Sequence, residues 1–235
     1  MLQQVLYICK IVKYIYTLLA SAIITTSACT SQKIVKPLEK GQQQVSANLG
    51  GPLIGFGGLT IPVPLTSVNY ARGITDSLTI HGSLQTTSLI YKTIQLDAGA
   101  TYGILQPKGW KPGLSVSGSL NVLTDMREGN ARLYPQLDAN LYWEYGSDNF
   151  MYLGSTNWIE LVGTKAHEQT QEKRILSGIQ FGNTWVTPKW SFTAESKWLA
   201  PTRSSLYSVV DYKSYSLAGE PRGAVGIYFG IARRF

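Results

Sequence analysis

From about residue 43 onward, apolar and polar residues alternate along the chain. Within residues 133–145, Leu137 and Leu141 fall on one face, whereas Asp138 and Asn140 fall on the other. A helix would scatter these residues around its axis, but a strand sorts them onto two faces. The alternation therefore predicts β-strands over most of the chain.

Roughly ten segments show this pattern, each of about 9–13 residues, near the length that crosses a bilayer at a tilt. The predicted strands are 43–50, 63–72, 77–86, 94–104, 113–123, 133–145, 150–160, 174–186, 189–199 and 223–235. Short, turn-rich links alternate with longer ones, as in outer-membrane barrels with short periplasmic turns and longer outer loops. We therefore expect an all-β fold, a transmembrane antiparallel up-and-down β-barrel of about ten strands, with eight or twelve as the alternatives. Residues 50–64 are rich in glycine and proline and could form a loop, a plug or a bent strand.

The composition fits a barrel that has one lipid-facing side. Charged residues make up 15% of the chain, against a usual share of roughly 25%. The formal net charge of +7 first suggests nucleic acid as a partner, but the sequence has no basic helix, zinc-ligand spacing or ribonucleoprotein motif. Attraction to anionic headgroups explains the basic excess better, so we expect outer-membrane lipids and no nucleic acid as partners.

Aromatic residues gather near the ends of the predicted strands, where Trp and Tyr girdles form at the headgroup level of a membrane. The residues expected to form such girdles are Trp110, Trp143, Tyr145, Phe150, Tyr152, Trp158, Trp185, Trp190 and Trp198.

The N-terminal region has the features of an export signal. Its first residues include two lysines and no acid, and the uncharged run 14–28 ends in small residues just before Cys29. Because this run is shorter than the roughly 20 apolar residues of a transmembrane helix, we expect a cleaved signal peptide over 1–28. Residues 29–42 are polar and without a sustained period, and are predicted to be a tether to a barrel domain over 43–235.

The residues before Cys29, Thr26-Ser27-Ala28, resemble the lipobox of bacterial lipoproteins, in which small residues precede a cysteine that is acylated. The lipobox usually has Leu or Val at the position that Thr26 occupies, so the match is partial. The resemblance implies lipidation of Cys29. Cleavage that leaves Cys29 unmodified is the alternative.

The final strand, GAVGIYFGIARRF, separates large apolar side chains from small ones, which suits lipid outside a crowded lumen. Its large apolar face consists of Val225, Ile227, Phe229, Ile231 and the terminal residue Phe235. This segment resembles the C-terminal signal by which the barrel-assembly machinery recognises its substrates. Residues 73–90 resemble strand-turn-strand sequence of outer-membrane proteins from Bacteroidetes-like bacteria. The resemblances imply a small outer-membrane β-barrel protein, with the assembly machinery as a partner during biogenesis, and assign no specific family.

The polar faces of the predicted strands place a set of ionisable side chains toward the lumen. They are His81, Asp97, Asp138, Glu144, Lys189, Glu195 and Lys197. Opposite charges on neighbouring strands predict a lumen closed by salt bridges, with a narrow pore as the alternative. His81 is expected to form hydrogen bonds in the lumen rather than to act in catalysis, and His167 falls in a loop. No spacing of His, Cys or carboxylate residues predicts a metal site, and we expect no catalytic residue and no cofactor.

The sequence therefore indicates an outer-membrane β-barrel (lipo)protein with a structural or accessory envelope role and no enzymatic activity. We expect both termini on the periplasmic side and other envelope proteins as partners. A narrow channel for small solutes is the main alternative. Further alternatives are a membrane-embedded hydrolase and a soluble lipocalin-like lipoprotein, whose apolar face would point inward.

Overall fold

The computed structural model describes residues 33–56, 59–127, 129, 131–162, 174–204, 215–216 and 222–235. The predicted signal peptide, Cys29 and His167 lie outside these residues, so the expectations for them stay predictions.

Within the described ranges, ten strands of 8 to 15 residues form the wall of a barrel. They are β1 (Gln43–Phe56), β3 (Leu65–Thr75), β4 (Leu78–Gln85), β5 (Thr93–Leu105), β6 (Gly113–Asp125), β7 (Ala131–Tyr145), β8 (Asn149–Ile159), β9 (Ile175–Val186), β10 (Trp190–Ser204) and β11 (Arg222–Arg234). A short strand, β2 (Leu59–Pro62), pairs with the end of β1, and the short helix α2 (Thr86–Ile90) links β4 to β5.

Antiparallel pairing joins each wall strand to the next and closes the ring. The closing seam pairs β1 with β11 over nine positions, beginning with Gln44 opposite Arg234. At the end of this seam the Phe235 N–H donates to the Gln43 carbonyl at 2.9 Å, and the Gln43 N–H donates to the Phe235 carbonyl at 3.2 Å. Because closure gives every wall strand two neighbours, the backbone polar groups are satisfied within the wall, as a bilayer requires. The predicted closed antiparallel barrel is confirmed.

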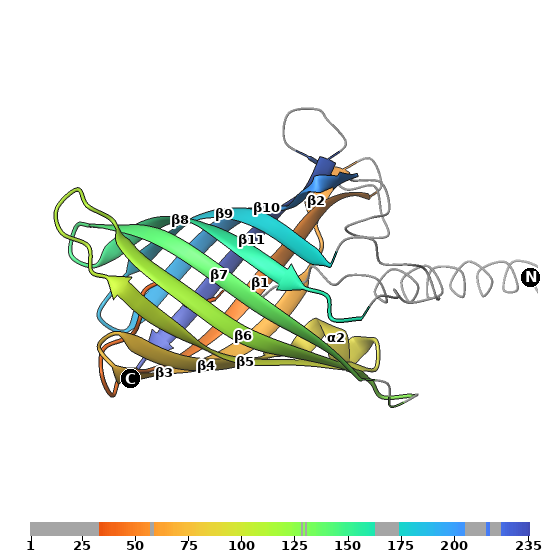
Figure 1. Ribbon diagram of the computed structural model, residues 1–235, viewed down its shortest axis with the longest axis horizontal. Coiled ribbons are helices and arrows are strands. Elements are labelled where there is room, and N and C mark those ends of the chain that lie inside the picture. The colour runs from red at the N-terminus through yellow and green to blue at the C-terminus, as the bar shows by residue number, and fades with distance from the viewer. Residues whose placement is uncertain are drawn as a thin grey trace, which may run out of the picture.

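The two ends of the barrel differ (Figure 1). One, the turn end, carries the short links between β3 and β4, β5 and β6, β7 and β8, and β9 and β10, together with Phe235. The other, the loop end, carries α2 and the links between β1 and β3, β4 and β5, β6 and β7, β8 and β9, and β10 and β11. There the β1–β11 seam opens, and the backbone of Tyr215 bonds the Leu53 carbonyl at 3.1 Å and the Val225 N–H at 2.8 Å. A residue of the β10–β11 link thus fills the gap where two strands diverge.

Side chains alternate between an apolar outer surface and a polar lumen. On the outer surface Leu96 and Phe181 are 46% and 57% exposed, whereas Thr101, Ser115 and Asn140 inside the barrel are at most 1% exposed. A membrane barrel places its apolar face toward lipid, and a soluble lipocalin-like barrel does the reverse. The structure therefore overturns the lipocalin-like alternative.

The terminal strand follows the same division. Phe229 and Phe235 are exposed on its outer face. Arg233 shares that face at the turn end, with its guanidinium carbon 5.6 Å from the ring centre of Trp190 and 5.1 Å from that of Phe235. A cation beside aromatic rings is compatible with the headgroup level of a membrane.

The described residues of the range 50–64 follow the bent-strand alternative. Strand β1 continues to Phe56, and β2 returns antiparallel to it. Gly50 has a φ of +145°, and a side chain there would clash with the β11 backbone at Ile227 and Tyr228. Glycine lets β1 bend across the seam at this close approach.

Part of the predicted aromatic girdle faces the lumen instead. Phe150, Tyr152 and Trp158 are buried inside the barrel, because they share the inward parity of β8. Trp185 and Trp190 do lie on the outer surface near the turn end.

Candidate functional site

Residues 33–42 are called the inner segment below; residues 33–38 lie inside the barrel, and residues 39–41 are exposed at its turn end. Lys33 sits at mid-depth beside Asp97 of β5, and the chain runs from there to the turn end, where the Gly41 N–H donates to the Gly73 carbonyl at 2.9 Å. The chain then continues into β1. The predicted tether therefore does not describe these residues, because their contacts are with the wall of the lumen.

Two lysines hold the inner segment to carboxylates of the wall. The Lys33 Nζ lies 2.7 Å from the Asp97 Oδ1, and the two side chains are only 5% and 2% exposed. The Ser83 hydroxyl donates to the other carboxylate oxygen of Asp97. Nearer the turn end, the half-buried Lys36 Nζ lies 2.7 Å from the Glu144 Oε1. Because the first pair is buried, loss of one partner would leave an uncompensated charge in the lumen.

Small hydroxyl residues of β4, β5 and β6 bond the backbone of the inner segment. The Ser115 Oγ donates to the Val35 carbonyl at 2.6 Å. The Thr101 Oγ1 donates to the Ile34 carbonyl at 3.1 Å. The Leu38 N–H donates to the Thr79 Oγ1 at 2.8 Å. These bonds satisfy backbone groups that have no strand partner, which buried backbone requires.

Apolar packing adds to these polar contacts. Val35 is buried in a cluster with Tyr142, Phe150 and Tyr152, which come from β7 and β8. Leu38 is likewise buried. The inner segment thus has two apolar anchors in an otherwise polar lumen.

Glycines on the facing strands leave room for the inner segment. A Cβ atom at Gly73 would clash with the carbonyl of Glu39, and one at Gly103 would lie 3.1 Å from the Pro37 Cγ. The close approach of the segment to β3 and β5 therefore depends on the missing side chains.

A second buried ion pair lies on the β10 side of the lumen. The Lys197 Nζ is 3.1 Å from the Glu195 Oε1, with both side chains 1% exposed. The Tyr152 hydroxyl donates to the Glu195 Oε2 at 2.6 Å, and the Lys197 Nζ lies 5.1 Å from the ring centre of Tyr228. The Tyr152 ring lies over Gly182, where a Cβ atom would clash with it. This cluster links β8, β9, β10 and β11 across the lumen.

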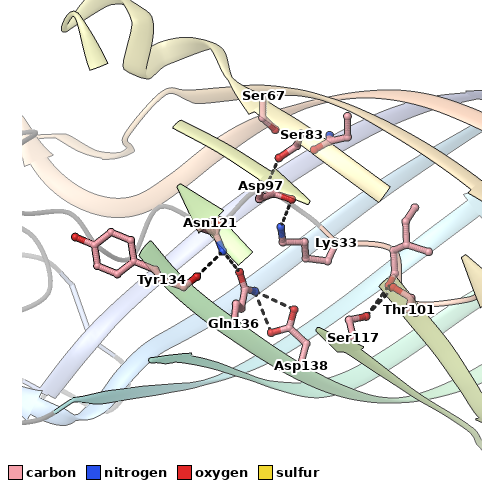
Figure 2. A network of polar contacts seen from close by, with 12 residues as sticks. Lys33, Ser67, Ser83, Asp97, Thr101, Ser117, Asn121, Tyr134, Gln136 and Asp138 are labelled. Carbon is pink, nitrogen blue, oxygen red and sulfur yellow. Dashed lines mark hydrogen bonds and ion pairs between the residues drawn. The ribbon is translucent and has the colours of Figure 1, made fainter. Parts of the chain in front are cut away.

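An amide network occupies the lumen beside the Lys33–Asp97 pair (Figure 2). The Gln136 Nε2 donates to both carboxylate oxygens of Asp138, at 2.9 and 3.0 Å. The Asn121 Nδ2 donates to the Gln136 Oε1 at 3.4 Å. Within the described part of the chain, Asp138 has this amide partner and no ion pair.

A polar cavity of about 260 Å³ lies between the inner segment and the wall. It extends from Asp148 and Pro188 at the turn end to mid-depth, where Lys33, Ser83 and Asp97 line it. Its wall carries amide and hydroxyl groups from Gln44, Ser46, Asn48, Asn69, Thr184, Ser191 and Thr193. The space beside the inner segment is therefore suited to water and small polar solutes.

The structure places most of the predicted lumen residues inside the barrel. Asp97, Asp138, Glu195 and Lys197 are buried there, and Glu144 meets the inner segment near the turn end.

Lys189 is the exception and corrects the prediction. It lies in the exposed turn between β9 and β10, because β10 begins one residue later than the alternation indicated, at Trp190.

His81 lines the cavity two residues before Ser83 on β4. Its Nε2 atom is buried without a hydrogen-bond partner, so the expected hydrogen bond is not seen at that atom. Ser83 bonds Asp97 directly, whereas nucleophilic catalysis would place the histidine between the hydroxyl and the carboxylate. These three residues do not have the arrangement that the hydrolase alternative needs.

The prediction from sequence missed the inner segment, and with it Lys33 and Lys36. A signal was present, because Ile34, Val35 and Leu38 interrupt a mostly polar stretch directly before the first strand. The matching signal on the wall is the run of small inward residues on β5 and β6.

No family model matches the chain, and no curated protein matches it. Among solved structures, the chain is similar to the translocator domain of the autotransporter NalP from Neisseria meningitidis, with 11% identity, coverage of 86% of this chain and 91% of that chain, and a TM-score of 0.47. It is also similar to an outer-membrane channel from Pseudomonas putida F1, with 9% identity, coverage of 88% and 100%, and a TM-score of 0.44. These likenesses concern the fold alone. The assignment to the outer-membrane type of β-barrel rests on the strand pairing and the two faces of the wall.

No helix in the described ranges is long and apolar enough to cross a membrane. The same ranges contain no cluster of three His, Cys, Asp or Glu residues that could hold a metal ion.

Proposed function

We propose that this chain is an outer-membrane β-barrel protein with a structural or accessory role in the bacterial envelope, and that its own inner segment keeps the lumen closed. The observation that carries the proposal is the seated segment. Its Lys33 forms a buried ion pair with Asp97, and its Val35 packs among aromatic residues of the wall. A barrel of about this size has little space beyond its own side chains.

The far side of the lumen supports closure as well. Lys197, Glu195, Tyr152 and Tyr228 fill the space between β8 and β11, and all four are buried. The inner segment fills one side of the lumen and this cluster fills the other. Because the lumen is then closed, the proposed envelope role falls to the two ends of the barrel, where lipids and other envelope proteins would contact it.

The proposal places the turn end in the periplasm, because outer-membrane barrels have short periplasmic turns and longer outer loops. Phe235 and the predicted assembly signal then lie on the periplasmic side, where the assembly machinery would meet them. The predicted periplasmic N-terminus lies outside the described residues and stays a prediction. Within those residues, the inner segment runs from Lys33 beside Asp97 to the turn end, where it enters β1.

Lipidation of Cys29 is kept as part of the proposal, on the lipobox resemblance alone. Incorporation of radiolabelled palmitate that disappears in Cys29→Ser would support it. Equal labelling of both chains would argue against it.

A narrow channel for small solutes is the second candidate. The polar cavity of about 260 Å³ favours it, because this cavity already extends from the turn end to mid-depth. In a closed barrel, this cavity is a vestibule that ends inside the lumen. In a channel, the same cavity is one half of the solute pathway.

Planar-bilayer recording of the purified full-length chain tests the first proposal. Folding is checked beforehand by heat-modifiable mobility on gels. We expect folded protein that inserts without single-channel steps, because the inner segment blocks the lumen. Steady single-channel steps from the folded full-length chain would contradict closure and favour the channel.

A further inference from the structure

We propose that the inner segment is a displaceable plug, and that the lumen it vacates is a pathway selective for small cations. This inference rests on the proposed closure of the barrel and adds to it a conducting state and a class of solute. It follows from how the segment is attached, where the cavity ends and how charges are distributed in the lumen.

The inner segment is bound on the side of the lumen that runs from β3 to β8. Its ion-pair and hydroxyl partners belong to β4, β5, β6 or β7, Val35 also packs against Phe150 and Tyr152 of β8, and Gly41 bonds Gly73 of β3. Its opposite side faces the polar cavity rather than β1 and β9 to β11. A segment with one bound side and one solvated side is released by breaking a single set of contacts.

The segment has a hinge at one end. Gly41 has a φ of +84° and bonds Gly73 at the turn end, directly before the chain enters β1. A left-handed glycine is the residue that most readily accommodates a change of direction. The seam between β1 and β11 therefore stays closed while residues 33–40 of the inner segment move.

The cavity stops where Lys33 meets Asp97 and Ser83. These residues line its inner end, whereas Asn121, which pairs with Asp97 on the neighbouring strand β6, and Gln136 of β7 do not line it. Lys33 is thus the cap of the cavity. Withdrawing its side chain would join the cavity to the amide-lined part of the lumen around Asn121 and Gln136.

Charge decides which solutes would pass. Inside the wall strands of the described chain, away from the loop-end rim, the acidic lumen residues are Asp97, Asp138, Glu144 and Glu195, and the basic ones are Lys197 and Arg234. Lys33 and Lys36 of the seated segment bring the two signs to equal number, with histidine neutral. At the rim itself, Asp125 and Glu160 are acidic and Arg132 is basic.

Displacement removes both lysines and leaves a lumen with excess negative charge. Asp97 and Glu144 lose their partners, and Asp138 has only an amide partner. Rings of carboxylates in a narrow, low-dielectric pore favour cations. Lys33 and Lys36 therefore have two roles: they hold the inner segment in the lumen, and they neutralise the carboxylates that would otherwise favour cations.

The test reverses the two lysines in the full-length chain. Lys33→Glu/Lys36→Glu places like charges beside Asp97 and Glu144, so that the segment is repelled while the wall stays unchanged. The matched control is Lys40→Glu/Lys108→Glu, with the same change in net charge at two exposed positions. Each protein is checked for folding by heat-modifiable mobility and recorded in planar bilayers under a gradient of KCl.

We expect single-channel steps from Lys33→Glu/Lys36→Glu, with a reversal potential that shows K⁺ passing several-fold more readily than Cl⁻. The control and the wild type are expected to stay silent. Adding Asp138→Asn to the open variant should move the K⁺ to Cl⁻ permeability ratio toward one.

Silence of the folded Lys33→Glu/Lys36→Glu variant, or conductance that favours Cl⁻, would overturn the inference and leave the proposed closed barrel standing. Conductance of the wild type would instead contradict the closed barrel. If the double variant does not fold, Gly73→Ala displaces the segment by steric clash with the Glu39 carbonyl, and the same outcomes apply to it.

Discussion

At the scale of single residues, the lumen is organised by buried polar pairs. Lys33 and Asp97 belong to segments that are far apart in sequence, yet they meet at 2.7 Å with almost no exposed surface. Lys197 and Glu195 meet at 3.1 Å on the opposite side. A buried pair of this kind is costly to form and much more costly to break, because the remaining charge has no solvent. Each pair therefore sets the position of the chain that carries it.

The Lys33–Asp97 pair gives a first prediction. Lys33→Met should lower the stability of the folded barrel by about 3–5 kcal/mol, the usual cost of breaking a buried pair from one side. Lys33→Met/Asp97→Leu should recover most of this loss, since no charge is then left uncompensated. Thermal unfolding followed by gel mobility measures both. Lys40→Met, at an exposed position of the same segment, is the control. Equal stability of Lys33→Met and the control would contradict the pair.

A second residue-scale prediction concerns Gly182. Its missing side chain makes room for the Tyr152 ring, whose hydroxyl bonds Glu195 at 2.6 Å. Gly182→Ala should therefore cost roughly 1–3 kcal/mol through overpacking. Gly118→Ala serves as the matched control, because its Cβ would lie 3.7 Å from the Leu137 side chain, an ordinary contact. Similar unfolding temperatures for the two variants would contradict the close packing of Tyr152.

At the scale of elements, the strands could be predicted from sequence and the inner segment could not. Two-residue alternation fixes both the strand and its outward face, so β5, β6 and β7 agree with the predicted spans to within two residues. The alternation is lost where the backbone bends at Gly50, which is why β2 was not foreseen.

The inner segment has no period, because it is neither helix nor strand. Its conformation is dictated by partners such as Thr79 and Asp97, which are about 40 to 64 residues away in sequence and become its neighbours only when the barrel has closed. A pattern of consecutive residues cannot predict such long-range contacts. The lumen face of Asp97 was accessible to prediction, but the lysine that neutralises it was not.

The terminal strand gives a prediction at this scale. Deleting Phe235 removes two backbone hydrogen bonds to Gln43 as well as an exposed aromatic ring. Phe235→Ala removes the ring alone. If the ring acts as the assembly signal, both changes should lower the amount of heat-modifiable barrel in outer membranes several-fold, with similar severity. Normal assembly of Phe235→Ala would show that the seam bonds, and not the ring, matter at this position.

At the scale of the whole molecule, the barrel is defined by two surfaces and an occupied interior. The outer surface is apolar and the lumen polar, and residues 33–38 of the inner segment lie within that lumen. The inner segment depends on the wall, because it bonds small residues of β4 to β6, and it leads directly into β1, which closes the ring. The central claim is that the barrel contains its own N-terminal segment.

Cross-linking inside intact cells tests this claim most directly. The Leu38 N–H lies 2.8 Å from the Thr79 Oγ1, so Leu38→Cys/Thr79→Cys in a Cys29→Ser background places two thiols within reach of a short bifunctional reagent. The control, Leu38→Cys/Ser177→Cys, carries its second thiol on an exposed residue of β9. We predict an internal cross-link in the heat-modifiable outer-membrane form of the first pair and none in the control. A folded barrel that yields no Leu38–Thr79 cross-link, or links both pairs equally, would contradict a seated inner segment.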